Sequence, residues 1–101
     1  MSGDSLEKLR GRISALNRKL LDEVNERLRL VAEIRALKVE RGLAMHDPVR
    51  EEQMLRELVA ANPGPLTEAQ LREVFEAIFS VSLEFLERPT PLPIPPASPK
   101  D

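Results

Sequence analysis

A repeat of apolar residues in the first part of the chain constrains its fold more than any other feature. Four aliphatic residues fall on a seven-residue spacing: Leu6, Ile13, Leu20 and Ile34. Arg27 occupies the remaining position of this spacing, where another Leu or Ile is expected. Further apolar residues at three- and four-residue steps predict one amphipathic helix from about Ser5 to Arg41. At about 1.5 Å per residue it would be about 55 Å long, which is long for a small domain and predicts packing along a second chain.

Capping and turn signals predict the limits of this helix and of two more. Asp4 with Glu7 resembles a capping box, and Gly42 is a C-terminal stop signal. Asp47 followed by Pro48 is typical of a second helix start, with Asp as the cap. The segment ANPGP ends that helix.

A third amphipathic helix follows the ANPGP segment. Thr67 with Gln70 forms another capping box, and the apolar face that follows ends near Arg88. No alternating pattern predicts a strand. The expected fold class is therefore all-α, with a long, a short and a medium helix in chain order.

The last segment, PTPLPIPPASPKD, is too rich in proline to form a helix or an interior strand. An extended conformation of the polyproline-II type is expected. We therefore expect a helical domain over residues 1–88 and a Pro-rich extended tail or linker over residues 89–101. The tail would be a linker to a further domain, a peptide ligand for a partner, or a plain disordered end.

Length and composition exclude several classes of protein. The chain has 101 residues, enough for one small domain. A net charge of −2 and only three aromatic residues argue against nucleic-acid binding, which usually needs a basic excess and stacking platforms. Without cysteine there is neither a disulfide framework nor a thiolate metal site. No apolar run reaches the roughly 20 residues of a membrane span, and no signal peptide is evident, so we expect a cytoplasmic protein.

Three cations lie within or beside the apolar stripe of the first helix. Arg27 allows three interpretations. It could extend its guanidinium group into solvent, it could be a buried residue that fixes register or oligomeric state, or it could be part of an anion pocket in a helical bundle. Lys38 lies about three turns later on the same face, roughly 16 Å along the axis. Arg10 lies about 25 Å before Arg27. It would reach the same ligand from a second, antiparallel copy, giving a two-fold dimer with two equal sites.

Two further groups of polar residues are candidates for the same site. Asp47, Arg50 and Glu51 are neighbours at the start of the second helix, and the alternative is a cap with ordinary surface charges. Ser82 lies within the apolar face of the third helix. The alternative there is a small core residue whose hydroxyl bonds to a backbone carbonyl. His46 is expected to be solvated.

Several catalytic motifs are missing from the sequence. It has no Gly-rich phosphate loop, no HExxH and no Ser–His–acid set, and one histidine cannot build a usual zinc site. We expect no metal and no cofactor. Catalysis would therefore depend on holding a substrate in shape and on electrostatic stabilisation.

A resemblance to a known family rests on three segments: LEKLRGRISALNRKLLDEVNERLRLVAEIRALK, DPVREEQML and FEAIFSVSLEFL. Together they are similar to the all-α class of chorismate mutases over about residues 5–88. This resemblance implies an intertwined homodimer of three-helix chains. It also implies an isomerase that catalyses the Claisen rearrangement of chorismate to prephenate, in the biosynthesis of Phe and Tyr.

The resemblance implies a role for each candidate residue. Arg27 resembles the arginine that binds one substrate carboxylate, and Arg10 the one that reaches from the partner to the other carboxylate. Lys38 resembles the lysine that bonds to the ether oxygen and a carboxylate, and Glu51 the acid that binds the substrate hydroxyl. Three more match polar residues around the substrate: Asp47, Arg50 and Ser82.

The sequence departs from the family at one position. The family usually has Gln or Glu four residues after the serine, where it contacts the ether oxygen, but this chain has Leu86 followed by Glu87. Either Glu87 takes the role through a shifted helix end, or the contact is missing. A second hypothesis is a non-catalytic helical dimerisation or regulatory domain, with Arg27 and Lys38 in structural ion pairs. Domains of this type can also be fused to, or associate with, the synthase that opens the shikimate pathway.

Overall fold

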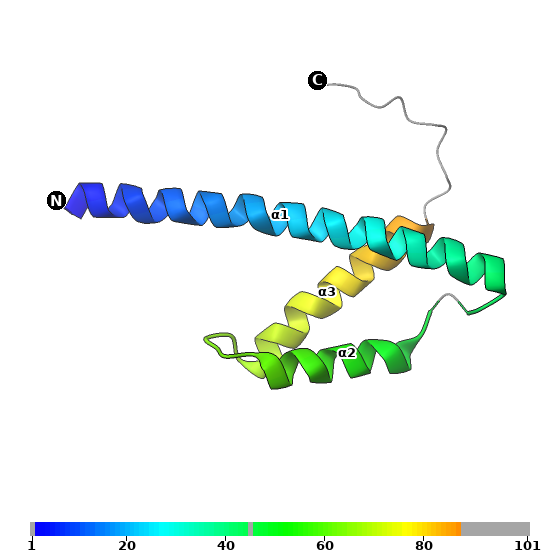
Figure 1. The fold of residues 1–101 in the computed structure, drawn as a ribbon. Helices are drawn as coiled ribbons and strands as arrows, with labels where there is room; N and C mark the ends of the chain where they lie inside the picture. Colours follow the sequence, from blue (N-terminus) through cyan, green and yellow to red (C-terminus); the bar gives the residue numbers. More distant parts are fainter. Residues whose placement is uncertain (1, 45, 88–101) are drawn as a thin grey trace, which may run out of the picture. The chain divides into compact units, whose positions relative to one another are not determined.

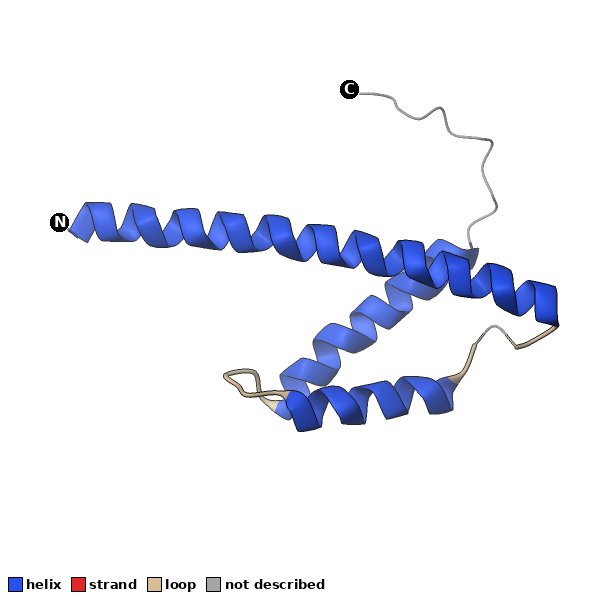
Figure 2. Cartoon of the chain, viewed as in Figure 1, coloured by secondary structure: helices blue, strands red, loops and turns tan. Residues whose placement is uncertain are grey.

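The computed structural model describes residues 2–44 and 46–87, which form three helices and no strand (Figure 1, Figure 2). Helix α1 is Ser2–Arg41, α2 is Pro48–Ala61 and α3 is Glu68–Glu87. The all-α fold class and the long, short and medium order are confirmed. The predicted Pro-rich tail, 89–101, lies outside the described residues. α1 forms one unit of the chain, and α2 with α3 forms another.

Helix α1 begins earlier than predicted and ends where predicted. Asp4 lies inside the helix, so the predicted capping box of Asp4 with Glu7 is wrong. At the other end Gly42 has a φ of 69°, the left-handed conformation that glycine adopts without steric cost. The Leu43 N–H donates to the Lys38 carbonyl at 2.8 Å, closing the last turn in the usual glycine-ended manner.

The apolar stripe of α1 is exposed in the single chain. Its first half has exposed fractions between 48% and 61%: Leu6, Leu9, Ile13, Leu16 and Leu20. Ile34, in the second half, is 51% exposed. Aliphatic side chains in one continuous row gain free energy when they leave water. The row is therefore an apolar surface that is exposed in the single chain.

Local side-chain bonds define the ends of α2 and α3. Asp47 caps α2, where its Oδ1 accepts from the Arg50 N–H at 3.0 Å, and Pro48 takes the first helical position. Thr67 and Gln70 form the predicted capping box, with each side chain bonded to the other's backbone N–H at 3.1 Å. Asn62 follows α2 and bonds to both Gly64 and Leu66 in the connecting turn.

A small core holds α2 and α3 together. Leu55, Leu71 and Phe79 are its buried side chains among the described residues. Partly buried neighbours pack around them: Met54, Leu58, Val59 and Phe75. The rings of Phe75 and Phe79 lie 6.5 Å apart at 58°, a favourable tilted arrangement. This core fixes the middle and second half of α2 relative to the first two thirds of α3.

Candidate active site

Three of the candidate site residues are cations of α1. Arg27 and Lys38 are half-buried, whereas Arg10 is exposed. Their eleven-residue separation corresponds to about three helical turns, so the two half-buried cations share the face of the apolar stripe. Arg27 is thus less exposed than Leu20 and Ile34, the aliphatic residues before and after it in the seven-residue spacing. Positive charge is placed inside a surface that is otherwise aliphatic.

The start of α2 supplies the second group of candidates, in three different settings. The Asp47 carboxylate accepts from the Arg50 backbone, so it acts as the cap that the alternative interpretation predicted. The Arg50 side chain is exposed, and its Nη1 donates to Gln53 Oε1 at 3.3 Å. Glu51 is half-buried and lies in the first turn, where the helix dipole favours a carboxylate.

Glu51 lines a cavity of about 280 Å³ between the start of α2 and the middle of α3. The floor is apolar, with Leu55 and Phe79, and the rim carries Glu76 and Ser80. The sequence analysis did not identify either rim residue. The periodicity of α3 is defined by its apolar residues. That periodicity does not indicate which polar residues border a cavity.

His46 is exposed, as expected, and it also lies close to Glu51. Its Nε2 lies 3.5 Å from Glu51 Oε2, and about half of its side chain is exposed. The sequence did not predict this contact, because His46 lies in the connector before α2, where no helical periodicity indicates which way a side chain points. A protonated His46 would form an ion pair with the carboxylate.

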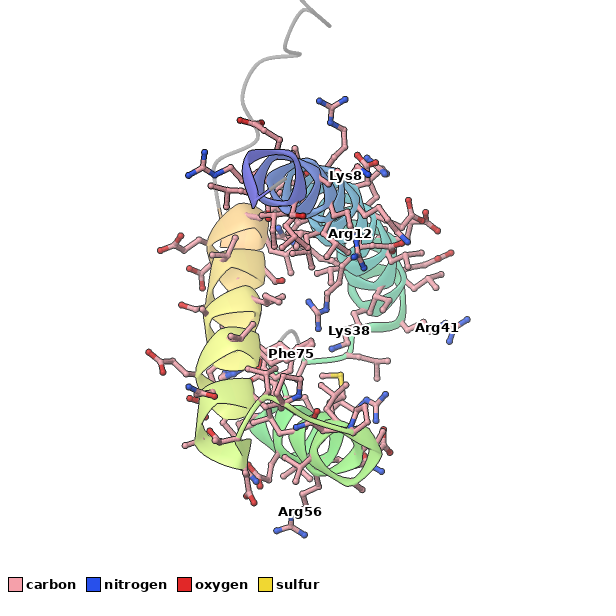
Figure 3. The ribbon with its side chains drawn as sticks, turned by 90° about the vertical axis from the view of Figure 1, so that its left-hand side faces the viewer. Lys8, Arg12, Lys38, Arg41, Arg56 and Phe75 are labelled. Atoms are coloured by element: carbon pink, nitrogen blue, oxygen red, sulfur yellow. The ribbon has the colours of Figure 1, made fainter. Side chains whose placement is uncertain are left out.

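A charged network next to Glu51 ties α2 to α3. Arg72 of α3 donates from Nη1 and Nη2 to the two oxygens of Glu52 at 3.3 and 3.2 Å, and its Nε lies 3.3 Å from Glu68. Arg56 also donates to Glu52, while its side chain points outward from the hairpin (Figure 3). The hydrogen bonds from Arg72 hold the pKa of Glu52 below its usual value. Glu52 in turn raises the pKa of Arg72. This two-pronged pair orients the first turns of α2.

The third helix carries Ser82 and the position that departs from the family pattern. Ser82 is buried, and its Oγ donates to the Ile78 carbonyl at 2.7 Å, as the structural alternative predicted. Leu86, one turn later, is half-buried, whereas Glu87 is exposed. The helix continues regularly through Glu87. A residue turns by about 100° from the one before, so Glu87 does not share the face of Ser82.

Neither a metal cluster nor a spanning helix is found in the part of the chain that the structure describes. Within residues 2–44 and 46–87, His, Asp and Glu side chains form no group of three that could hold a metal ion. None of the helices in those ranges has the length and hydropathy needed to cross a membrane.

The helices and their side chains define an all-α chain whose longest helix carries cations on its apolar face and whose hairpin presents a carboxylate to a cavity. The sequence model of the chorismate mutase type II family matches residues 9–87. This chain belongs to that family, which confirms the resemblance found in the sequence.

Solved structures that are similar to this chain include two forms of one chorismate mutase. Form II of the chorismate mutase from Thermus thermophilus has a TM-score of 0.79 and 44% identity, covering 82% of this chain and 94% of that one. Form I of the same protein has a TM-score of 0.75 and 44% identity, covering 76% and 96%.

Curated relatives match over most of this chain. Bifunctional chorismate mutase/prephenate dehydratases from Stutzerimonas stutzeri and Pseudomonas aeruginosa are each 32% identical over 91 residues. The match covers 85% of this chain and 25% of each relative. The chain therefore spans about a quarter of the length of these curated relatives.

Proposed function

We propose that this chain is a chorismate mutase, an isomerase that converts chorismate to prephenate in the biosynthesis of Phe and Tyr. One observation carries the proposal: in a chain of this family, Arg27 and Lys38 are half-buried within the apolar stripe of α1. Cations on one face of a helix can bind the carboxylates of a small anion through charge-assisted hydrogen bonds. Chorismate is a small dianion.

The reaction suits these residues because it is unimolecular. Arginines grip carboxylates through two parallel hydrogen bonds, so Arg27 and Arg10 of the partner subunit would hold the substrate's two carboxylates. This grip favours the compact, reactive conformer over the extended one. As the C–O bond breaks, negative charge grows on the ether oxygen. Lys38, aimed at that oxygen, would stabilise the transition state more than the ground state.

The hairpin of α2 and α3 supplies the remaining contacts in this proposal. Glu51 would accept from the substrate hydroxyl, because it is half-buried and faces the cavity between the two helices. Asp47 and Arg50 would act around it, the first by capping α2. The Ser82 hydroxyl donates a hydrogen bond to the Ile78 carbonyl. In the proposed site the Ser82 oxygen would therefore contribute to the packed wall beside the substrate.

We propose a homodimer because the site needs a residue from a second copy. The exposed aliphatic row in the first half of α1 has the length and the regular spacing to pack along another α1. In an antiparallel pair, Arg10 of the partner subunit would approach the half-buried cations of the first chain. The two-fold symmetry then gives two equal sites.

The test compares Arg27→Ala with Arg29→Ala. Arg29 lies two residues later on the same helix. Its side chain is 64% exposed and pairs with Glu26 of the same helix at 2.9 Å. Removing a preorganised cation from the site should lower kcat/KM for chorismate by a factor of about 10² or more, while Arg29→Ala stays near wild type. The readout is chorismate consumption by ultraviolet absorbance, with helicity and dimer mass measured in parallel. Equal turnover in both variants and the wild type would contradict the assignment.

The second hypothesis, a non-catalytic dimerisation or regulatory domain, predicts no turnover in the wild type. Membership of the family favours catalysis. The curated relatives join a chorismate mutase to a prephenate dehydratase, which supports a fusion or association with another enzyme of aromatic biosynthesis. The synthase expected from the sequence and a cytoplasmic location both stay predictions.

A further inference from the structure

One edge of α1, beside the apolar stripe, changes sign along its length. Its first half is basic: Lys8, Arg12 and Lys19. Its middle is acidic: Glu23, Glu26 and Glu33. Successive members are three, four or seven residues apart, so all six project from one side of the helix, and all are exposed. Figure 3 shows Lys8 and Arg12 on this side, and we call the six residues the charged edge.

We propose that the charged edge selects the register in which two copies of α1 pair. This inference rests on the homodimer of the proposed function and names the residues that specify it. When two identical helices pack antiparallel about a two-fold axis, each edge meets the same edge of the partner. The basic half of one chain then lies along the acidic middle of the other.

The aliphatic spacing alone leaves the register ambiguous, because a shift of seven residues restores the stripe. Only one register overlaps α1 over its whole length, Ser2 against Arg41, and covers every stripe residue. In that register Leu20 packs nearly level with Val24 of the partner subunit. Lys19 then lies between the partner's Glu23 and the partner's Glu26, about one turn or less from each along the axis.

The charged edge opposes the two neighbouring registers. Shifting the pair by seven residues in one direction brings Lys19 nearly level with the partner's Lys19 at the two-fold axis. Shifting it in the other direction brings Glu26 nearly level with the partner's Glu26. Like charges facing each other at the centre destabilise both alternatives. The charged edge therefore discriminates among registers that the seven-residue aliphatic spacing alone allows.

The selected register has a consequence for the active site. Arg10 of the partner subunit falls level with Glu33 and Ile34, about 10 Å past Arg27 and about 7 Å before Lys38 along the axis. Arginine and lysine side chains span such distances toward one small ligand. The edge charges, which take no part in binding, thus place the third cation between the other two.

Lys19→Glu tests the proposal, with Arg18→Glu as its matched control. Arg18 is adjacent, equally exposed and on the side away from the stripe. It also has an acid four residues later, Asp22, as Lys19 has Glu23, so both variants lose the same local attraction. Each exposed pair contributes about a factor of two to an equilibrium constant, and Lys19→Glu removes four pairs across the dimer. The dimer dissociation constant, from sedimentation equilibrium at low salt, should rise at least about tenfold, equivalent to about 1.4 kcal/mol.

Mixing Lys19→Glu with Glu23→Lys separates contacts between chains from contacts within one. Each variant alone carries like charges across the dimer, but a mixed pair restores opposite charges, while the local repulsion within each helix persists. With one chain labelled with ¹⁵N, native mass spectrometry should find mainly the mixed dimer, and chorismate consumption should recover. Asp22→Lys in place of Glu23→Lys should give no such preference.

Each outcome is decisive. Equal dissociation constants for Lys19→Glu and Arg18→Glu, or a random mixture of dimers, would overturn the register assignment even if the wild type consumes chorismate. If the wild type is a dimer and the variants differ as predicted, but the wild type consumes no chorismate, the proposed function is overturned and the register assignment stands. A wild-type monomer would overturn both.

Discussion

Leu86→Gln should raise the rate of the proposed chorismate mutase reaction. The side chain lies one turn after the buried Ser82 on α3, turned only about 40° from it, and is half-buried. A glutamine there would place a neutral N–H donor where the family usually has one for the ether oxygen. In the present chain Lys38 is the expected donor to that oxygen, so a second donor adds to stabilisation of the transition state.

The magnitude follows from the position of Leu86. Removing one preorganised donor from an oxyanion site typically costs about 10²–10³ in kcat. A neutral amide added to a site that has not been shaped around it should recover less, about tenfold or 1.4 kcal/mol. Half-burial of a leucine contributes on the order of 1 kcal/mol, so the exchange should lower the free energy of unfolding by a similar amount.

The assay is kcat for chorismate consumption, with Leu86→Met and Glu87→Gln as controls. Methionine keeps the volume and supplies no donor, whereas Glu87 is exposed and lies on another side of α3. Both controls should stay near wild type. If Leu86→Gln is folded and dimeric but no faster than Leu86→Met, the ether oxygen does not lie beside this position and the reasoning is refuted.

Three further predictions concern stability. Leu55→Ala should lower the free energy of unfolding by about 2–5 kcal/mol, measured by urea denaturation, because Leu55 is 3% exposed in a small core; a loss below about 1 kcal/mol would contradict that core. Glu52→Gln should destabilise at neutral pH but not in acid. Arg72 lowers the pKa of Glu52 in the folded state, so the ion pair stabilises the fold fully above the unfolded-state pKa of about 4.3. This stabilisation is lost as the pH falls through the folded-state pKa of Glu52. If urea titrations show the same difference in stability between the two proteins in acid as at neutral pH, the prediction is refuted. Gly42→Ala should cost about 1 kcal/mol, since φ is 69° there; unchanged thermal unfolding would refute it.

The local signals in the sequence predicted most of the fold. Helix ends depend on residues that are close in the chain, which is why Asp47, Thr67 with Gln70, and Gly42 were identified correctly. The start of α1 was the exception. Ser2 to Asp4 continue the helix because nothing in their sequence stops it, and a capping pattern inside a helix looks the same as one at its end.

The sequence also supplied candidate site residues, and their roles stay predictions. Periodicity identified Arg27 and Lys38, because a cation in an aliphatic row is visible without any knowledge of tertiary structure. It did not indicate that Arg72 would reach Glu52, which is twenty residues away in the sequence, or that His46 would approach Glu51. Those contacts depend on how α2 packs on α3, and the apolar period of each helix leaves their relative rotation open.

The exposed aliphatic row on α1 also has a consequence for how the protein behaves on dilution. In the proposed homodimer, covering the row with a second copy would supply much of the folding free energy, so mass action would link folding to concentration. Melting temperature and specific activity should then fall together as the protein is diluted toward its dissociation constant. Measurements on this protein are comparable only at the same subunit concentration.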